Sequence, residues 1–217
     1  MELKGKKINF LGDSITEGHG ASSKDKCFVS LIEKNTGAIC RNYGVGGSRY
    51  ALQNPLYLEV RSDWDFCMRL AELDADADIV VVFGGTNDYG HGSAPIGTPE
   101  DRTNETFYGA CHTLYRSLIE KFPEATIVII TPLHRCNEDD PKGSHKTVDV
   151  APLKTYVDII RSVAKIYALP LLDLYATSGI QPNVPIIQQK FMPDGLHPND
   201  EGYKILASKI TRFLENL

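Results

Sequence analysis

Two short, unbroken apolar runs constrain the fold of this chain more than any other feature of its sequence. They lie at 78–83 and 126–131 and read Asp-Ile-Val-Val-Val-Phe and Thr-Ile-Val-Ile-Ile-Thr. A strand with one solvated face alternates apolar and polar residues, whereas a strand buried on both faces is apolar throughout. Both runs therefore predict central strands of a sheet that helices cover on both sides.

Further apolar runs alternate along the chain with amphipathic stretches. In the stretch at 105–122, apolar residues recur every three or four positions and Pro123 follows to stop the helix. The remaining predicted strands lie at 8–11, 38–42 and 169–174, and the other predicted helices lie near 27–36, 63–73, 153–167 and 200–214. Such alternation indicates a parallel sheet. The sequence predicts a three-layer α/β/α sandwich with a five-stranded parallel sheet, formed by residues 1–217 as one domain.

Composition excludes several classes of partner. The 217 residues carry a net charge of -5, and neither nucleic acid nor an anionic membrane favours an acidic protein. No apolar run reaches the roughly 18 residues of a membrane span, and the start of the chain has no signal-peptide core. The five cysteines form no Cys-x-x-Cys pair, which argues against disulfides and zinc. We expect a cytoplasmic protein, not inserted in a membrane, that binds a small molecule.

Two predicted connections, 88–104 and 135–151, are unusually long. Most connections have about four to six residues, and longer ones are often functional. Each of the two follows a predicted strand, so in a parallel sheet both lie at the carboxyl edge, where open α/β folds bind ligands. We expect these loops to border a binding site.

A serine follows the first predicted strand at this same edge. Ser14 belongs to the segment 12–20, which reads Gly-Asp-Ser-Ile-Thr-Glu-Gly-His-Gly. The glycines allow a tight backbone path that exposes a side chain. Ser14 is therefore a candidate nucleophile, and the alternative is a serine that only caps a helix or forms a turn.

A serine hydroxyl is a poor nucleophile at neutral pH unless a base accepts its proton. Of the six histidines, His197 follows Asp194 by three residues in a turn that contains glycine and proline. In such a turn Asp194 can fix the tautomer of His197 and stabilise its imidazolium form. The alternative is a turn that only caps the helix predicted at 200–214.

Acyl transfer also requires hydrogen-bond donors for the oxyanion. The segment at 42–48, Asn-Tyr-Gly-Val-Gly-Gly-Ser, follows the second predicted strand and offers glycine N–H groups. The segment at 84–88, Gly-Gly-Thr-Asn-Asp, follows the third strand and offers the Asn87 amide. The residues alone leave open whether Gly44, Gly46 or Gly47 donates, and each segment can also serve only as a turn.

Motifs of several other enzyme classes are absent. The sequence contains no Gly-x-Ser-x-Gly, His-Glu-x-x-His, Gly-x-x-x-x-Gly-Lys-Ser/Thr or complete Gly-x-Gly-x-x-Gly. We therefore expect neither a metal nor a cofactor. The remaining histidines lack an acid at a matching spacing and are expected to be structural or exposed; they are His19, His91, His112, His134 and His145.

Together, the four segments resemble the sequence blocks of the SGNH, or GDSL, hydrolases. The matching residues are Gly12-Asp13-Ser14-Ile15, the glycines around Gly47, Gly84-Gly85-Thr86-Asn87 and Asp194-x-x-His197, and the resemblance spans residues 8–203. It implies a flavodoxin-like strand order, with Ser14 as nucleophile, His197 as base and Asp194 as its partner. It also implies an oxyanion hole formed by Ser14, Gly47 and Asn87.

These residues predict a serine-dependent carboxylic ester hydrolase that forms an acyl-enzyme. The loops contain no long apolar stretch for a lipid chain, which favours short-acyl esters such as acetylated carbohydrates. The alternatives are a lysophospholipase or thioesterase, an acyltransferase with the same triad, and a catalytically silent binding module. The candidate substrate contacts are Asp13, Tyr50, Trp64, Asp88, His91 and His134.

Overall fold

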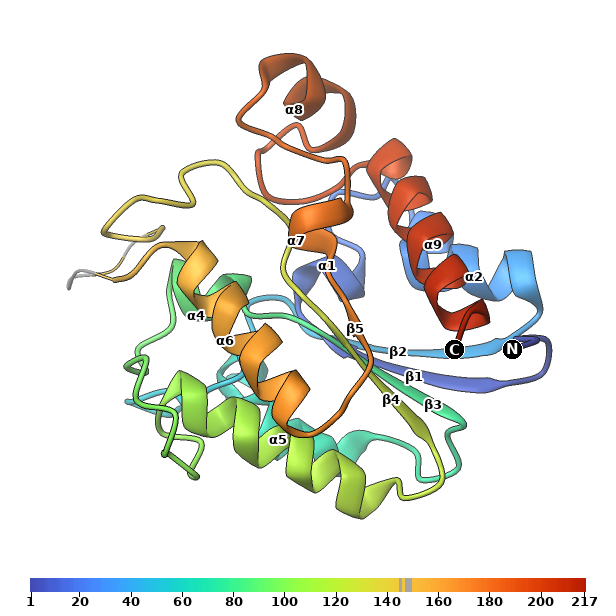
Figure 1. The fold of residues 1–217 in the computed structure, drawn as a ribbon. Helices are drawn as coiled ribbons and strands as arrows, with labels where there is room; N and C mark the ends of the chain where they lie inside the picture. Colours follow the sequence, from blue (N-terminus) through green and yellow to red (C-terminus); the bar gives the residue numbers. More distant parts are fainter. Residues whose placement is uncertain (145, 147–149) are drawn as a thin grey trace.

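A computed structural model of the chain contains a five-stranded parallel sheet between two layers of helices (Figure 1). The structure describes residues 1–144, 146 and 150–217. The strands lie in the order β2-β1-β3-β4-β5, which is the flavodoxin-like order. The predicted α/β/α architecture, the parallel sheet and the strand order are therefore confirmed.

The two apolar runs form central strands. They become β3 (Ile79–Phe83) and β4 (Thr126–Ile130), and every residue of β3 is buried. The others are β1 (Lys7–Gly12), β2 (Ile39–Gly44) and the edge strand β5 (Leu171–Leu172). β5 is shorter than the predicted strand at 169–174, and Pro170 has no N–H to donate to a ladder at this edge.

The side chains of each central strand divide between two cores. Val80 and Val82 pack in the core under α5 (Phe107–Lys121) and α6 (Leu153–Ile166). Val81 and Phe83 point to the opposite core, under α2 (Phe28–Thr36) and α9 (Asp200–Glu215). Figure 1 shows these two helix pairs on opposite sides of the sheet. The central strands are thus apolar because both of their faces are buried, as the sequence predicted.

The prediction of a single helix at 63–73 is wrong. This region contains a 3-10 helix (Arg61–Asp63), the four-residue α3 (Phe66–Arg69) and another 3-10 helix (Leu70–Glu72). The Asp65 carboxylate accepts the Met68 N–H and so caps a new helix in the middle of the predicted one.

Short helices that the sequence did not predict lie after the strands and near the C-terminus. They are α1 (Ser14–Glu17), the 3-10 helix Lys24–Lys26, α4 (Thr86–Gly90), α7 (Leu174–Thr177) and α8 (Pro185–Phe191). α1 follows β1 and α4 follows β3, so both lie at the carboxyl edge of the sheet. The predicted loop 88–104 begins within α4, and the loop 135–151 includes residues 145 and 147–149, which lie outside the described residues.

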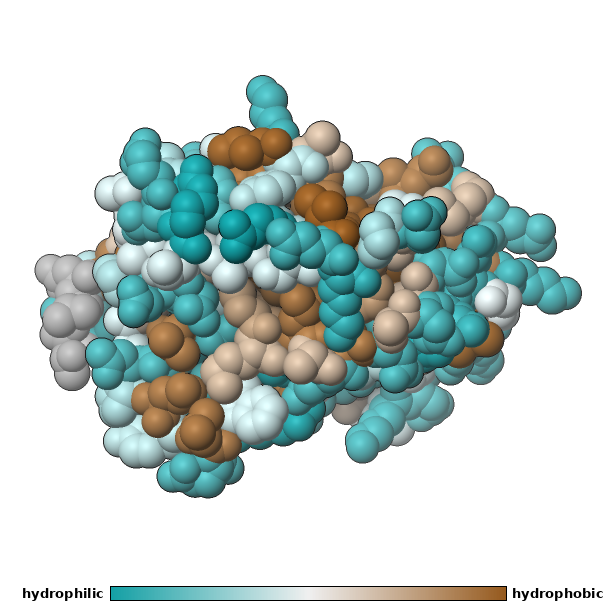
Figure 2. Space-filling view, turned by 90° about the horizontal axis from the view of Figure 1, so that it is seen from below, coloured by the Kyte–Doolittle hydropathy of each residue, from teal (hydrophilic) through white to brown (hydrophobic). Residues whose placement is uncertain are grey.

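Hydrophobic residues gather mainly inside the molecule. Over the described residues, no helix combines the length and hydrophobicity that crossing a membrane requires. The face seen from below is covered largely by hydrophilic residues, with hydrophobic ones in small groups (Figure 2). The two cores on either side of the sheet therefore contain most of the large apolar side chains.

Candidate active site

Ser14 is held where β1 passes into α1. Asp13 caps α1, because its Oδ1 accepts the Ile15 N–H at 3.0 Å. Ser14 is the first residue of this helix, and only 6% of its surface is exposed. Its N–H has no hydrogen-bond partner among the described residues, as expected at a helix start.

The side chains of Ser14, His197 and Asp194 form a hydrogen-bonded series. Ser14 Oγ lies 3.0 Å from His197 Nε2, and His197 Nδ1 lies 2.7 Å from Asp194 Oδ2. Asp194 Oδ1 also accepts the N–H groups of Leu196 and His197. Burial raises the pKa of Asp194, but these hydrogen bonds outweigh burial and bring the pKa below its usual value. Asp194 is therefore an ionised acceptor at neutral pH.

The turn that carries Asp194 is not the cap of α9. Asn199 caps that helix, since its Oδ1 accepts the N–H groups of Glu201 and Gly202. Gly195 has a φ of 76°, which suits glycine, and an added Cβ would lie 2.6 Å from Cys136 Sγ. The Asp194 carboxylate thus binds Leu196 and His197 within its own turn, and the helix-capping interpretation of this residue is wrong.

α9 is tied directly to the serine segment. Tyr203 of α9 is fully buried, and its hydroxyl lies 3.0 Å from the carbonyl oxygen of Ile15 and 2.6 Å from that of His19. The His19 ring also packs edge-on against the His197 ring. These contacts hold the two ends of the chain together at Ser14.

The structure distinguishes the three candidate glycines. Gly44 ends β2, and its N–H is donated to Asn42 Oδ1. The Gly46 N–H is donated to Glu17 Oε2 at 2.7 Å. Gly47 has a φ of 80° in the tight turn closed by Ser48 N–H and Val45 C=O, and its N–H has no partner among the described residues. Gly47 is therefore the glycine with an N–H left to donate.

Arg69 braces this turn from behind. It is fully buried, and its Nη1 donates to Gly12 C=O and to Ser48 Oγ, each at 2.9 Å. Its Nη2 donates to the carbonyl of Tyr43. One guanidinium thus joins the ends of β1 and β2 to the glycine turn, a role that the sequence did not indicate.

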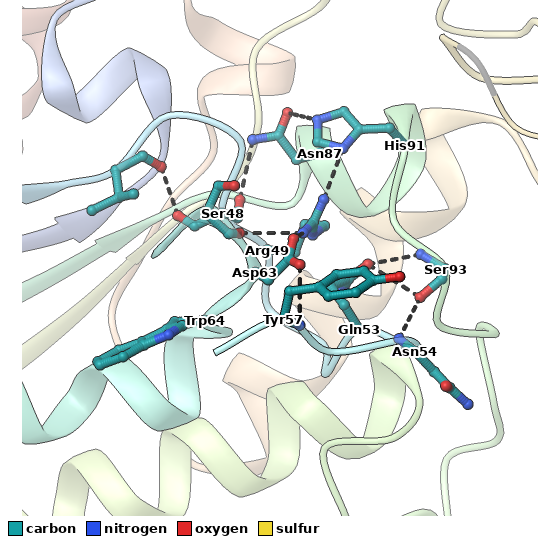
Figure 3. A network of polar contacts seen from close by, with 12 residues as sticks. Ser48, Arg49, Gln53, Asn54, Tyr57, Asp63, Trp64, Asn87, His91 and Ser93 are labelled. Atoms are coloured by element: carbon teal, nitrogen blue, oxygen red, sulfur yellow. Dashed lines mark hydrogen bonds and ion pairs between the residues drawn. The ribbon is translucent and has the colours of Figure 1, made fainter. Parts of the chain in front are cut away.

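A relay of hydrogen bonds fixes the Asn87 amide (Figure 3). Arg49 pairs with Asp63 at 2.8 Å and lies 2.9 Å from His91 Nδ1. His91 Nε2 lies 3.0 Å from Asn87 Oδ1, and Asn87 Nδ2 donates to Ser48 C=O at 3.1 Å.

The donors and acceptors of this relay allow one arrangement. A guanidinium only donates, so His91 Nδ1 accepts from Arg49 and His91 Nε2 carries the proton that Asn87 Oδ1 accepts. A carbonyl only accepts, so the nitrogen of the Asn87 amide faces Ser48. One N–H of Asn87 Nδ2 is thereby used, and the second has no partner among the described residues.

These groups line one cavity of about 490 Å³ at the carboxyl edge of the sheet. Ser14, Gly47, Asn87, His91 and His197 all lie on its wall. Gly46, an alternative oxyanion donor in the sequence, also lies on this wall. Lining residues that the sequence did not single out as site residues are Glu17, His19, Val45, Ser62, Arg135, Ser144 and Leu196. His19 was expected to be structural or exposed; it is exposed and lines the cavity.

Asp13 and Asp88 are buried supports and do not line this cavity. Asp88 accepts the N–H groups of Tyr50 and Ala51, each at 3.0 Å, and so holds that segment against α4. Burial raises the pKa of Asp13 to about 7 and that of Asp88 to about 6. The prediction that they contact substrate is not supported by the cavity, because both carboxylates bind backbone N–H groups behind it.

Three other predicted substrate contacts also lie away from the cavity lining. Tyr50 is fully buried in the α5 core and contacts Tyr115. Trp64 donates its indole N–H to Leu58 C=O and lies apart from the relay (Figure 3). His134 Nδ1 lies 2.8 Å from Glu138 Oε1. The sequence-based expectation that His134 lacks an acidic partner is therefore wrong. His91 alone of the six predicted contacts lines the cavity.

The raised pKa of Asp13 predicts a stability that falls as the pH rises. The unfolded carboxyl ionises near 3.8, so between that pH and about 7 the folded protein holds more protons than the unfolded chain. Raising the pH from about 5 to about 8 is expected to lower the Tm by at least about 4 °C, and Asp13→Asn should remove much of this fall. Thermal unfolding at several pH values measures this fall in Tm, and Asp139→Asn, at an exposed aspartate, is the control. An unchanged slope in Asp13→Asn would contradict the assignment.

The chain matches one protein family over most of its length. The model of the GDSL-like lipase/acylhydrolase family matches residues 10–205. No curated protein matches the chain. The match covers every block that carries the hydrogen-bonded series, the glycine turn and Asn87.

Solved structures show the same fold. One crystal structure is 32% identical, with a TM-score of 0.85 over 100% of this chain and 99% of its own. A protein from Lactobacillus plantarum is 27% identical, with a TM-score of 0.83 over 99% and 98% of the two chains. A two-domain esterase active on acetylated mannans is 21% identical, with a TM-score of 0.60 over 99% of this chain and 50% of its own. The last likeness shows the fold alone.

Proposed function

The chain belongs to the GDSL-like lipase/acylhydrolase family, and on this premise we propose that it is a serine-dependent carboxylic ester hydrolase that works through an acyl-enzyme. The observation that carries the proposal is the series in which Ser14 Oγ, His197 and Asp194 are joined at 3.0 Å and 2.7 Å. A hydroxyl, an imidazole and a carboxylate in this order form the arrangement that activates a serine.

In the first step, His197 Nε2 accepts the proton of Ser14 while Ser14 Oγ forms a bond to the ester carbonyl carbon. Asp194 accepts the Nδ1–H of His197, which fixes the tautomer and stabilises the imidazolium. The tetrahedral intermediate collapses when His197 donates its proton to the leaving alcohol. The acyl group then remains on Ser14.

The oxyanion is stabilised by three donors whose N–H groups have no other partner in the described part of the chain. They are the backbone N–H groups of Ser14 and Gly47 and the second N–H of the Asn87 amide, and all three residues line the cavity. Donors fixed before the reaction stabilise developing charge without reorganising. In the second step, water gives a proton to His197 and attacks the acyl carbon. The bond between this carbon and Ser14 Oγ then breaks as His197 returns the proton to Ser14 Oγ, and the acid is released.

The cavity favours a short acyl group on a polar alcohol. Among the described residues that line it, only Val45 and Leu196 have aliphatic side chains. Each buried methylene contributes about 0.8 kcal/mol to binding, and two aliphatic side chains offer too little apolar surface to bury a long acyl chain. Acetylated carbohydrates fit this lining, because the serines, histidines and Glu17 offer partners for hydroxyl groups.

The lining predicts a chain-length profile. We expect kcat/KM for p-nitrophenyl esters to be highest for acetate or butyrate and to fall at least about tenfold by octanoate, because the described lining offers only Val45 and Leu196 to the additional methylenes. Initial rates on a series from acetyl to palmitoyl, beside acetylated sugars, measure this. A maximum at decanoate or beyond would instead favour a lipid hydrolase.

Covalent labelling separates an enzyme from a silent binding module. A fluorophosphonate probe should label the wild-type protein on Ser14, because the reagent requires an activated serine. Ser14→Ala should remove the label, and Ser23→Ala, at an exposed serine, should keep it. Mass spectrometry of the labelled peptide identifies the site. A folded wild-type protein that takes no label would favour the binding module.

A further inference from the structure

Arg135 brings a buried positive charge to the wall of the active-site cavity. Only 8% of the residue is exposed, yet it lines the cavity together with Ser14 and His197. Its Nη1 lies 3.3 Å from both Thr86 C=O and Thr86 Oγ1, and its Nη2 donates to Ser144 Oγ at 2.7 Å. All these partners are neutral oxygens.

The other two buried arginines each have an acid. Arg49 pairs with Asp63 at 2.8 Å, and Arg69 lies 3.6 Å from Glu72. No carboxylate of the described residues lies within 4.0 Å of the Arg135 guanidinium. Burial accordingly lowers the pKa of Arg135 below its usual value. Asp13 and Asp194 favour the Arg135 cation only from beyond this distance. A buried charge is costly unless an opposite charge pairs with it directly, so Arg135 is poised to bind an anionic group.

The acid that does line the cavity lies at another part of the wall. Glu17 accepts the Gly46 N–H, and Gly46 also adjoins His19. Arg135 and Ser144 instead adjoin Gly90, at the end of the helix that carries Asn87. Ser144 Oγ accepts from Arg135, and its own O–H has no acceptor among residues 1–144, 146 and 150–217. The cavity thus has a cationic end with two donors beside the Asn87 donor.

We propose that the ester substrate carries a carboxylate close to the scissile bond and that Arg135, together with Ser144, binds this anionic group. Arginine binds carboxylates in charge-assisted hydrogen bonds, which are stronger than neutral ones. The net charge of -5 repels anions in general, so a preference for an anionic ester requires a local cation of this kind. The inference rests on the proposed esterase function and narrows its substrate class.

Matched pairs of esters test this inference. The carboxylate is placed in the acyl group in mono-4-nitrophenyl glutarate and in the alcohol in 4-acetoxybenzoate, and the methyl ester of each is its neutral partner. In the wild-type protein, kcat/KM should favour the anion in at least one pair, and that pair identifies the side on which the anion lies. Ser14→Ala supplies the background of spontaneous hydrolysis.

The variants assign the preference to Arg135. Arg135→Gln should lower the ratio of anionic to neutral kcat/KM at least tenfold, and Arg135→Lys should retain part of it. Arg116→Gln, at an exposed arginine of α5, makes the same change in net charge and should leave the ratio unchanged.

Two results would overturn the proposal: a wild-type protein that favours the neutral ester in both pairs, or a ratio that falls equally in Arg135→Lys, Arg135→Gln and Arg116→Gln. The wild-type ratios decide between the anionic and the neutral ester even if Arg135→Gln does not fold. A wild-type protein that hydrolyses none of the four esters would instead contradict the esterase function itself.

Discussion

Replacing Ser14 with alanine is expected to lower kcat for p-nitrophenyl acetate by about 10⁴- to 10⁶-fold. The change removes the hydroxyl that lies 3.0 Å from His197 Nε2, and with it the proposed acyl-enzyme. The fold should persist, because the Asp13 cap and the Tyr203 contact involve other atoms of this segment. Steady-state kinetics and circular dichroism together measure both outcomes.

His197→Ala should cause a loss of similar size, and the double variant with Ser14→Ala should lose little more. Residues that act as one unit are strongly non-additive, since removing either already abolishes nucleophilic attack. Ser23→Ala serves as the matched control. Hydrolysis at the wild-type rate by either folded single variant would exclude the proposed mechanism.

Replacing Asn87 with alanine should lower kcat by about 10²- to 10³-fold and change KM little. The Asn87 amide is proposed to bind the oxyanion, which is fully developed only in the transition state, so its loss affects the chemical step. The short-ester assay measures kcat and KM separately. A change confined to KM would show that Asn87 binds substrate without stabilising the oxyanion.

The relay makes His91 a positioning residue for Asn87. His91→Leu should lower kcat, whereas His91→Gln, which retains an acceptor for Arg49 and a donor for Asn87, should recover part of the loss. In an Asn87→Ala background, His91→Leu should have little further effect. Equal effects in both backgrounds would mean that His91 acts independently of Asn87.

The sequence predicted those parts of the structure that depend on local pattern. The run at 126–131 became β4 with an end shifted by one residue, because a strand buried on both faces admits few polar residues. The parallel sheet alone placed Ser14 and Asn87 at one edge, whereas His197 was assigned from its spacing to Asp194. The choice of Gly47 among three glycines came from the family resemblance, and the structure supplies its physical reason in the N–H groups that Gly44 and Gly46 already donate.

The errors concern contacts between distant segments. Tyr50 follows the glycine turn and looked available to a ligand, but Asp88 holds its backbone so that the ring enters the core. Trp64 lies apart from the relay (Figure 3), and its indole N–H is donated to Leu58 C=O. The sequence did not indicate a role for Arg135, because a lone arginine in a polar loop belongs to no motif or periodic pattern. Its significance depends on which acids fail to reach it, and this requires the folded chain.

Asp194 and His197, the proposed acid–base pair, lie three residues apart in one turn, whereas Ser14 lies 183 residues from His197. Forming the Asp194–His197 pair therefore costs almost no loop-closure entropy. Bringing His197 to Ser14 accounts for nearly all of the loop-closure entropy that this series of side chains costs. The proposed activity thus depends on contact between the two ends of the chain. Any event that separates α9 from β1 would leave the Asp194–His197 pair intact but would remove the proposed base from Ser14.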